Sequence, residues 1–151
     1  MIIAVDFDGT IVEHAYPLIG KPIPFAIDVL KKLQQEEHHF IILWTVREGD
    51  LLQEAVNYCE KQGLKFYAVN SNYPEEVFDE SISRKINADL YIDDKNIGGF
   101  PDWGIIYKMI KSGSNNIRYY DEFETNERPK KGKNFLIRLG ETLDMVTGRR
   151  Y

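Results

Sequence analysis

Four short apolar segments alternate with helix-like segments along the first two thirds of the chain, and this alternation constrains the fold more than any other feature. The apolar segments lie at residues 2–5, 40–45, 64–70 and 89–94. Continuous apolar runs of this length, separated by helices, are typical of strands in a parallel sheet that is covered on both faces. The sequence therefore predicts an α/β fold with a parallel sheet and helices on both faces.

Helical stripes occupy the intervals between these segments. Apolar residues recur at helical spacing over residues 25–33 and 51–59. Gly63 stands where a glycine commonly ends a helix. Further helices are expected directly after Pro74 and over residues 101–113 and 134–146.

Length and composition are those of one ordinary globular domain. A chain of 151 residues can bury a proper hydrophobic core, and its 43% apolar and 28% charged residues are typical of such domains. It contains no internal repeat and no clear linker. We expect a single domain over residues 1–151, with the motifs in about residues 1–97 and a helical extension over about residues 100–151.

Composition also narrows the compartment and the partners. No apolar stretch approaches the roughly 20 residues needed to span a bilayer, and the N-terminus lacks the features of a signal peptide. The one cysteine, Cys59, cannot form an intramolecular disulfide, which fits a reducing compartment. The net charge of −5 argues against nucleic acid as a partner. We expect a cytoplasmic protein that binds neither membrane nor nucleic acid.

Side chains that can bind a ligand or take part in catalysis follow three of the four predicted strands. They are Asp6 and Asp8 after the first strand, Thr45 after the second, and Asp93 with Asp94 after the fourth. In open parallel sheets, ligands bind outside the carboxyl ends of the strands. The sequence therefore predicts a site at this edge of the sheet.

The spacing of Asp6 and Asp8 raises a question of charge. Side chains two residues apart on an extended chain start on the same side, and two anions held close in a partly buried place repel each other. A cation, or a division of labour between the two, resolves the conflict. Asp93 and Asp94 add two more carboxylates, and an oxygen-rich site of this kind suits Mg²⁺.

Phosphoryl transfer gives each of these positions a role. Asp6 can attack a phosphoryl group in line and carry it as an acyl phosphate. Asp8 can protonate the leaving oxygen and then take a proton from the water that hydrolyses the intermediate. Thr45 offers a hydroxyl to a phosphoryl oxygen, and Lys85 supplies a compact positive charge.

Neighbouring residues are candidates for substrate contact. Gly9 lets the backbone turn closely past a phosphate, and N–H groups of the turn that includes Thr10 can cradle its oxygens. Arg47 can fork onto a second anionic group, although a surface arginine at the start of a helix explains it nearly as well. Asn70 and Asn72 follow a strand end, where substrate contact and turn chemistry are both reasonable interpretations.

Taken in order, the motifs resemble a known superfamily. They are Asp6-x-Asp8-Gly9-Thr10, then Thr45, then Lys85, then Asp93-Asp94. The haloacid dehalogenase superfamily carries its four motifs in this order, and the resemblance covers about residues 1–97. The stretches "WTVR" and "YIDDKN" are similar to those of small capless members associated with capsule or surface-polysaccharide synthesis.

This resemblance implies a Rossmann-like sheet and a magnesium-dependent phosphatase. By the resemblance, Mg²⁺ is held by Asp6, the backbone carbonyl of Asp8, and Asp93, while Asp94 supports the site or binds through a water. An aspartate at position 8 favours a phosphatase over a dehalogenase, because a leaving alkoxide needs an acid and a halide does not. The intervals between the motifs leave no room for a large cap, and residues 12–22, with His14, are expected to form a flap over the entrance.

Three functional hypotheses remain open from the sequence. The first is a phosphatase that acts on a sugar phosphate or a related small metabolite. The second is a phosphatase for the phosphorylated end of a macromolecule, since an open site permits one. The third is a regulatory domain that accepts phosphate without rapid turnover. The apolar C-terminal helix covers the sheet or makes a contact in a homo-oligomer, and the sequence does not decide between them.

Overall fold

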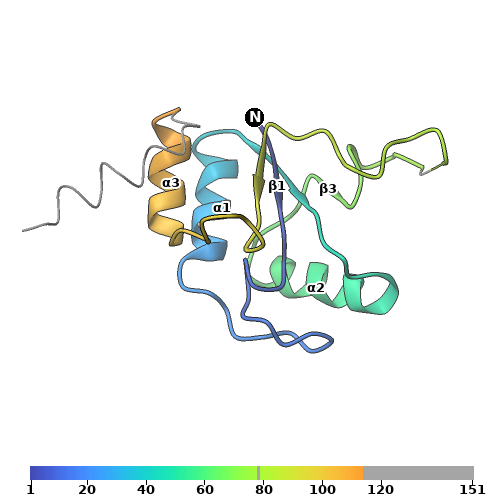
Figure 1. Cartoon of the computed structure of the whole chain (residues 1–151), viewed down its shortest axis with the longest axis horizontal. Coiled ribbons are helices and arrows are strands. Elements are labelled where there is room, and N and C mark those ends of the chain that lie inside the picture. Colours follow the sequence, from blue (N-terminus) through green and yellow to red (C-terminus); the bar gives the residue numbers. More distant parts are fainter. Residues whose placement is uncertain (78, 114–151) are drawn as a thin grey trace, which may run out of the picture. The chain divides into compact units, whose positions relative to one another are not determined.

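The computed structural model describes residues 1–77 and 79–113, and these form a parallel α/β sheet structure (Figure 1). The strands are β1 (Ile2–Val5), β2 (Phe40–Leu43), β3 (Ala68–Val69) and β4 (Leu90–Ile92), and the helices are α1 (Ala26–Gln35), α2 (Gly49–Lys61) and α3 (Trp103–Lys111). The strand order is β3-β2-β1-β4, and all neighbours are parallel. The predicted fold class is confirmed, and the described residues include no large cap.

The ends of α2 and α3 follow from local sequence chemistry. Gly63 adopts the left-handed conformation with φ 82°, and its N–H donates to the carbonyl of Glu60 at 2.9 Å. This confirms the predicted glycine stop after α2. At the start of α3, the Asp102 carboxylate accepts hydrogen bonds from the N–H groups of Gly104 and Ile105. Asp102 therefore satisfies two N–H groups that have no partner within the helix.

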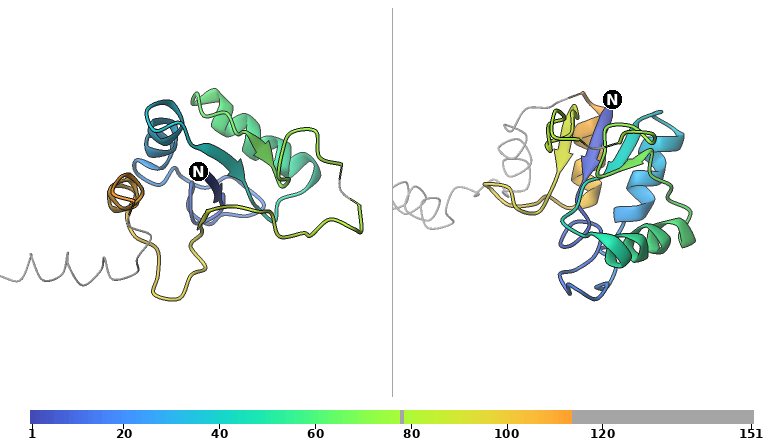
Figure 2. Two further views of the ribbon diagram at one scale, coloured as in Figure 1. Left: turned by 90° about the horizontal axis from the view of Figure 1, so that it is seen from above. Right: turned by 90° about the vertical axis from the view of Figure 1, so that its right-hand side faces the viewer.

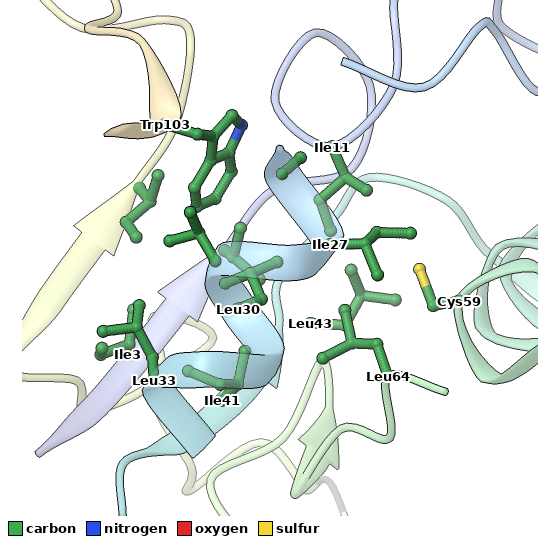
Figure 3. Close-up of a cluster of buried hydrophobic side chains, with 14 of the residues drawn as sticks. Ile3, Ile11, Ile27, Leu30, Leu33, Ile41, Leu43, Cys59, Leu64 and Trp103 are labelled. Carbon is green, nitrogen blue, oxygen red and sulfur yellow. The ribbon is translucent and has the colours of Figure 1, made fainter. Parts of the chain in front are cut away.

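One face of the sheet carries the main hydrophobic core, in which all three helices take part. Figure 3 shows Leu30 and Leu33 of α1 directed at Ile3 and Ile41 of the neighbouring strands. Cys59 of α2 is fully buried in the same cluster, and burial raises the pKa of its thiol to about 12. Packing is the role that its place on the apolar stripe of the helix predicts.

The opposite face of the sheet is covered by irregular chain. Here Ala4, Ile42 and Ala68 pack with Ile86, which precedes β4. In the left view of Figure 2, the segment between β3 and β4 (green to yellow) runs on the side of the sheet away from α1. The sequence predicted helices on both faces. Among the described residues, the helices lie against one face.

The prediction of a helix after Pro74 is wrong, because the described residues between β3 and β4 form no helix. Side-chain hydrogen bonds hold this segment in local turns: the Glu76 carboxylate accepts from the N–H of Asn72, and Asp79 accepts from that of Ser81. Val77 is 82% exposed, so this segment also lacks an apolar face that could hold a helix against the sheet.

Residues 1–113 form one compact unit. The predictions for the helix at 134–146 and for a single domain reaching residue 151 extend outside the described residues. None of the described helices has the length and apolarity that a membrane span requires.

Candidate active site

The carboxyl ends of β1, β2 and β4 border a cavity of about 760 Å³. The strand-end residues predicted from the sequence line it: Asp6, Asp8, Thr45 and Asp93, together with Asn70 and with His14 of the predicted flap. Parallel strands that end at the same edge bring together residues far apart in the chain, such as Asp6 and Asp93, since β1 pairs with both β2 and β4. The predicted location of the site is therefore the location of the cavity.

Three carboxylates converge beside β1 and β4. Asp6, Asp93 and Asp94 each place one oxygen so that all three atoms lie within 4.8 Å of one another. Burial raises the pKa of Asp6 from 3.8 to about 6; repulsion from Asp93, Asp94 and Asp8 adds to the rise, and a hydrogen bond from the Phe7 N–H opposes it. The arrangement costs free energy in the absence of a cation.

A divalent cation fits this donor set. All three candidate ligands are carboxylate oxygens, which Mg²⁺ and other hard cations prefer. The Oδ1 atom of Asp94 is buried and has no hydrogen-bond partner among the described residues, which is a costly state for an anionic oxygen. Asp6, Asp93 and Asp94 are thus the residues that could hold a metal ion.

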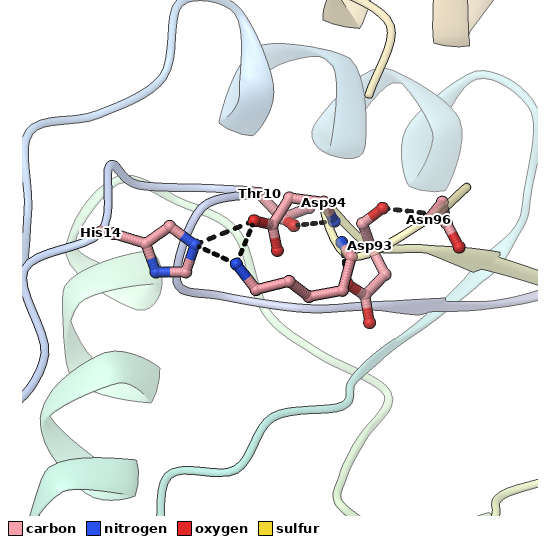
Figure 4. A network of polar contacts seen from close by, with 6 residues as sticks. Thr10, His14, Asp93, Asp94 and Asn96 are labelled. Carbon is pink, nitrogen blue, oxygen red and sulfur yellow. Dashed lines mark hydrogen bonds and ion pairs between the residues drawn. The ribbon is translucent and has the colours of Figure 1, made fainter. Parts of the chain in front are cut away.

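The second oxygen of Asp94 is well supplied with partners (Figure 4). Its Oδ2 atom lies 2.8 Å from His14 Nε2 and 2.9 Å from Lys95 Nζ. Burial disfavours the ionised carboxylate, but the hydrogen bonds from His14 and Lys95 outweigh it and hold the pKa of Asp94 below its usual value. His14 brings the predicted flap segment to the acidic cluster.

Gly9 and Thr10 form a tight turn behind the acidic cluster rather than part of the cavity lining. Gly9 has φ 90°, and a Cβ atom there would collide with His14 Nε2 and lie 2.7 Å from Asp94 Oδ2. The hydroxyl of Thr10 accepts the N–H of Asp94 at 3.1 Å, and its carbonyl accepts from Trp103 Nε1 at 3.0 Å. The close approach predicted at Gly9 is present, but the group approached is the His14–Asp94 pair.

Arg47 is used differently from the predicted substrate contact. Its side chain is fully buried, and its guanidinium donates from Nε and Nη2 to the two oxygens of Asp8, both at 2.7 Å. These hydrogen bonds raise the pKa of Arg47, so it stays charged. The fork bonds both oxygens of Asp8, and Arg47 is not among the residues that line the cavity.

Thr45 and Asn70 are held together at the ends of β2 and β3. The Asn70 side chain accepts the N–H of Thr45 at 2.9 Å, and both residues line the cavity. Asn72 is not among the lining residues. Its side chain donates to Glu76 and accepts the N–H of Asn87, so its predicted substrate role is replaced by turn chemistry.

The position of Lys85 does not match its predicted role. Its Nζ atom lies 5.0 Å from the centre of the Tyr91 ring, and Lys85 is absent from the cavity lining. The cationic side chains that do line the cavity are those of its neighbour Arg84 and of Lys95. The irregular path before β4 accounts for this change, because it turns Arg84 rather than Lys85 to the cavity.

Sequence reasoning missed several lining residues. Tyr16, Trp44, Val46, Glu48, Arg84 and Lys95 complete the cavity together with His14. A signal for two of them was available: Trp44 directly precedes Thr45, and Lys95 directly follows Asp94. Residues next to a strand-end motif share its edge of the sheet, so both belong among the candidates.

Comparison with known proteins gives relatives without an assigned activity. No protein-family model matches the chain. An uncharacterized protein of Haemophilus influenzae is 40% identical over 63 residues, which is 40% of this chain and 38% of that protein. The match therefore spans well under half the length of the curated relative.

A solved structure gives a broader match. A conserved protein from Bacteroides thetaiotaomicron is 63% identical and superposes with a TM-score of 0.71, covering 76% of this chain and 92% of that one. Identity at this level over nearly all of the solved chain is well beyond a shared fold alone. The chain belongs to the same family as this conserved Bacteroides thetaiotaomicron protein.

Proposed function

We propose that this protein is a Mg²⁺-dependent phosphatase of the haloacid dehalogenase superfamily, which hydrolyses the phosphomonoester of a sugar or related small metabolite through an aspartyl phosphate on Asp6. The observation that carries the proposal is the convergence of Asp6, Asp93 and Asp94 at one edge of the sheet, with a buried oxygen of Asp94 that has no partner in the part of the chain that the structure describes. This edge opens into a cavity large enough for a small metabolite.

Asp6, Asp93 and Asp94 would hold the metal through one carboxylate oxygen each. When bound, Mg²⁺ neutralises the cluster and stabilises the charge on a transferring phosphoryl group. Asn70 holds the backbone of Thr45 at the cavity wall, where the hydroxyl is available to a phosphoryl oxygen. Lys95 and Arg84 place further positive charge along the same lining.

Asp6 is the nucleophile of the proposed reaction. With a pKa of about 6, its carboxylate is mostly ionised at neutral pH and is less stabilised than that of an exposed aspartate. An Asp6 oxygen forms a bond to phosphorus, and the bond from phosphorus to the ester oxygen breaks. Water then attacks the phosphorus of the aspartyl phosphate, which releases phosphate and restores the Asp6 carboxylate.

Asp8 carries the protons of both steps. It gives a proton to the departing ester oxygen and takes one from the attacking water. Asp8 lines the cavity beside Asp6, and the fork from Arg47 holds both of its oxygens. The proton that Asp8 gives up in the first step is replaced in the second by a proton of the attacking water, so each turnover leaves Asp8 as it began.

The test is phosphate release from a panel of phosphomonoesters, with and without Mg²⁺. We expect metal-dependent turnover by the wild-type protein and a loss of at least about a thousandfold in Asp6→Asn, which removes the nucleophile at nearly constant volume. Glu60→Gln is the matched control, since Glu60 is an exposed acid on α2 and does not line the cavity. Equal activity of wild type and Asp6→Asn would contradict the mechanism, and silence across small esters would contradict the substrate class.

A further inference from the structure

Arg47 joins Asp8, the proposed acid–base residue, to a loop that lies about 30 positions from Arg47 in the sequence. Its guanidinium donates from Nη1 to the carbonyl of Pro17 at 3.0 Å and from Nη2 to that of Leu18 at 2.8 Å. The same guanidinium donates to both oxygens of Asp8 at 2.7 Å. One buried cation thus serves two elements of the site at once.

Aromatic rings complete the surroundings of this cation. The guanidinium carbon lies 5.0 Å from the centre of the Phe7 ring and 5.4 Å from that of Tyr16. Phe7 is fully buried, whereas Tyr16 lies on the loop, is 57% exposed and lines the cavity. Stacking of this kind favours the planar guanidinium over a lysine ammonium.

The loop itself, residues 13–21, is closed at its base, and we call it the wall loop. The N–H of Glu13 donates to the carbonyl of Lys21 at 2.8 Å, and Val12 and Pro22 form an antiparallel bridge just outside it. His14 ties the start of the wall loop to Asp94, and Arg47 ties its middle to Asp8. The segment is thereby held at two points of the site.

We propose that Arg47 is a positioning residue that fixes, with one guanidinium, both the orientation of Asp8 and the position of the wall loop along the cavity. The part that concerns Asp8 rests on the proposed phosphatase activity, and the part that concerns the loop does not. Arg47 is fully buried, so a direct contact with substrate does not account for it. Four hydrogen bonds from one side chain couple the acid–base residue to the cavity wall.

Lysine at position 47 separates charge from geometry. Arg47→Lys keeps a positive charge, but an ammonium cannot make two parallel hydrogen bonds to Asp8 and reach two carbonyls as well. If Arg47 only supplies charge, Arg47→Lys should behave like wild type. If Arg47 positions Asp8 and the wall loop, both should be disturbed in this variant.

The first measurement compares leaving groups. The p-nitrophenolate of p-nitrophenyl phosphate departs without a proton, whereas the alkoxide of an alkyl phosphate needs one from Asp8. In single-turnover experiments, which follow only the first step, we expect Arg47→Lys to slow release of the alcohol from the alkyl ester by about a hundredfold and release of p-nitrophenolate from the aryl ester by less than about tenfold. Asp8→Asn should show the same contrast. Equal losses for both esters in Arg47→Lys would overturn the role toward Asp8.

The second measurement is independent of activity. Hydrogen exchange of the full chain follows the amide of Glu13, which is bonded across the base of the wall loop. We expect exchange in residues 13–21 to rise about tenfold in Arg47→Lys, as after the loss of one or two hydrogen bonds, while β1 and α2 stay as protected as in wild type and in the Glu60→Gln control. Unchanged exchange of the wall loop would overturn its anchoring by Arg47.

Asp8→Asn keeps the proposal testable if Arg47→Lys fails to fold. This change leaves Arg47 in place and removes the charge that holds it. If Arg47 couples the two elements, the wall loop exchanges faster in Asp8→Asn as well, and a loop as protected as in wild type would overturn the coupling. If the wild-type protein hydrolyses neither ester, the proposed function fails, and the exchange results alone decide the role of Arg47.

Discussion

Two carboxylates of the site, Asp8 and Asp94, are built in opposite ways. Both oxygens of Asp8 accept hydrogen bonds from Arg47, which is fully buried. Asp94 has one oxygen facing His14 and Lys95, whose side chains are 51% and 70% exposed, and another that is buried without a partner among the described residues. The protein thus bonds both oxygens of Asp8 but only one oxygen of Asp94.

The difference between them corresponds to the two tasks that we propose. A group that moves protons must keep a fixed orientation, and a bidentate arginine provides it. A metal ligand must keep an oxygen available, so the protein supports one side of the carboxylate and leaves the other to the ion. The distribution of hydrogen bonds thus separates residues of the same chemical type by function.

Asp8→Asn should have the largest effect, because it removes the carboxylate that Arg47 holds by both oxygens. It leaves the guanidinium of Arg47 buried beside a neutral amide, at a cost of about 3 kcal/mol in the free energy of unfolding. A domain of this size is typically stable by about 5–15 kcal/mol, so the variant remains folded. We expect kcat to fall by about 10²–10⁴ on alkyl phosphates. Urea denaturation and steady-state kinetics measure both, and a variant as stable and active as wild type would contradict the assignment.

Asp94→Asn tests the proposed role of Asp94 as a metal ligand. The amide keeps the volume but removes the charge, so we expect the affinity for Mg²⁺ to fall by about 10–100-fold. The free energy of unfolding without metal should fall slightly at neutral pH, because the lowered pKa of Asp94 means that, despite burial, His14 and Lys95 stabilise its ionised carboxylate in the folded protein. Calorimetric titration with Mg²⁺ measures the affinity. Binding as tight as that of wild type would show that Asp94 does not take part.

The raised pKa of Asp6 makes the stability of the metal-free protein depend on pH. Burial and repulsion raise its pKa from 3.8 to about 6, so the folded protein binds this proton more tightly than the unfolded chain does. The resulting stabilisation is fully present below about pH 4 and is lost as the pH rises through about 6. Without metal, Asp6→Asn should therefore unfold at a higher temperature than wild type at about pH 7.5, with the gap closing toward pH 4. A wild type that is more stable at about pH 7.5 would contradict the repulsion.

Trp103→Phe tests a weaker interaction, the hydrogen bond from α3 to the turn that contacts Asp94. Trp103 Nε1 donates to the carbonyl of Thr10, whose hydroxyl accepts the N–H of Asp94. Phenylalanine fills most of the volume but leaves the Thr10 carbonyl without this donor, at a cost of about 1 kcal/mol. Thermal unfolding of the full chain measures the loss. No change in unfolding temperature would mean that α3 supports the turn through packing alone.

The sequence was sufficient to predict the features that depend on strand ends. Apolar runs identified the parallel sheet, and Asp6, Asp8, Thr45 and Asp93 line the cavity because each lies close behind the carboxyl end of a strand. Their position needs only the register of the strands, which hydrophobic patterning determines. The same reasoning applies to Asp94, which lies beside the cavity in the acidic cluster.

The errors concern contacts that depend on irregular chain. Arg47 pairs with Asp8, 39 positions away, and with two backbone carbonyls of the wall loop, which no residue type encodes. Lys85 and Asn72 lie on the irregular path between β3 and β4, where local hydrogen bonds of side chains decide the course. Motif spacing alone could not show that Arg84 rather than Lys85 lines the cavity.

The most direct test of the central claim is to trap the phosphoryl group on Asp6. Asp8→Asn, incubated with acetyl phosphate and Mg²⁺, should form the aspartyl phosphate, since acetate leaves without an acid, and hydrolyse it slowly, since the base is missing. Acid quenching followed by peptide mass spectrometry should find one phosphoryl group per chain on Asp6, dependent on Mg²⁺ and absent from Asp6→Asn. Turnover of acetyl phosphate with no phosphoryl group on Asp6, or with the group on another residue, would contradict the account.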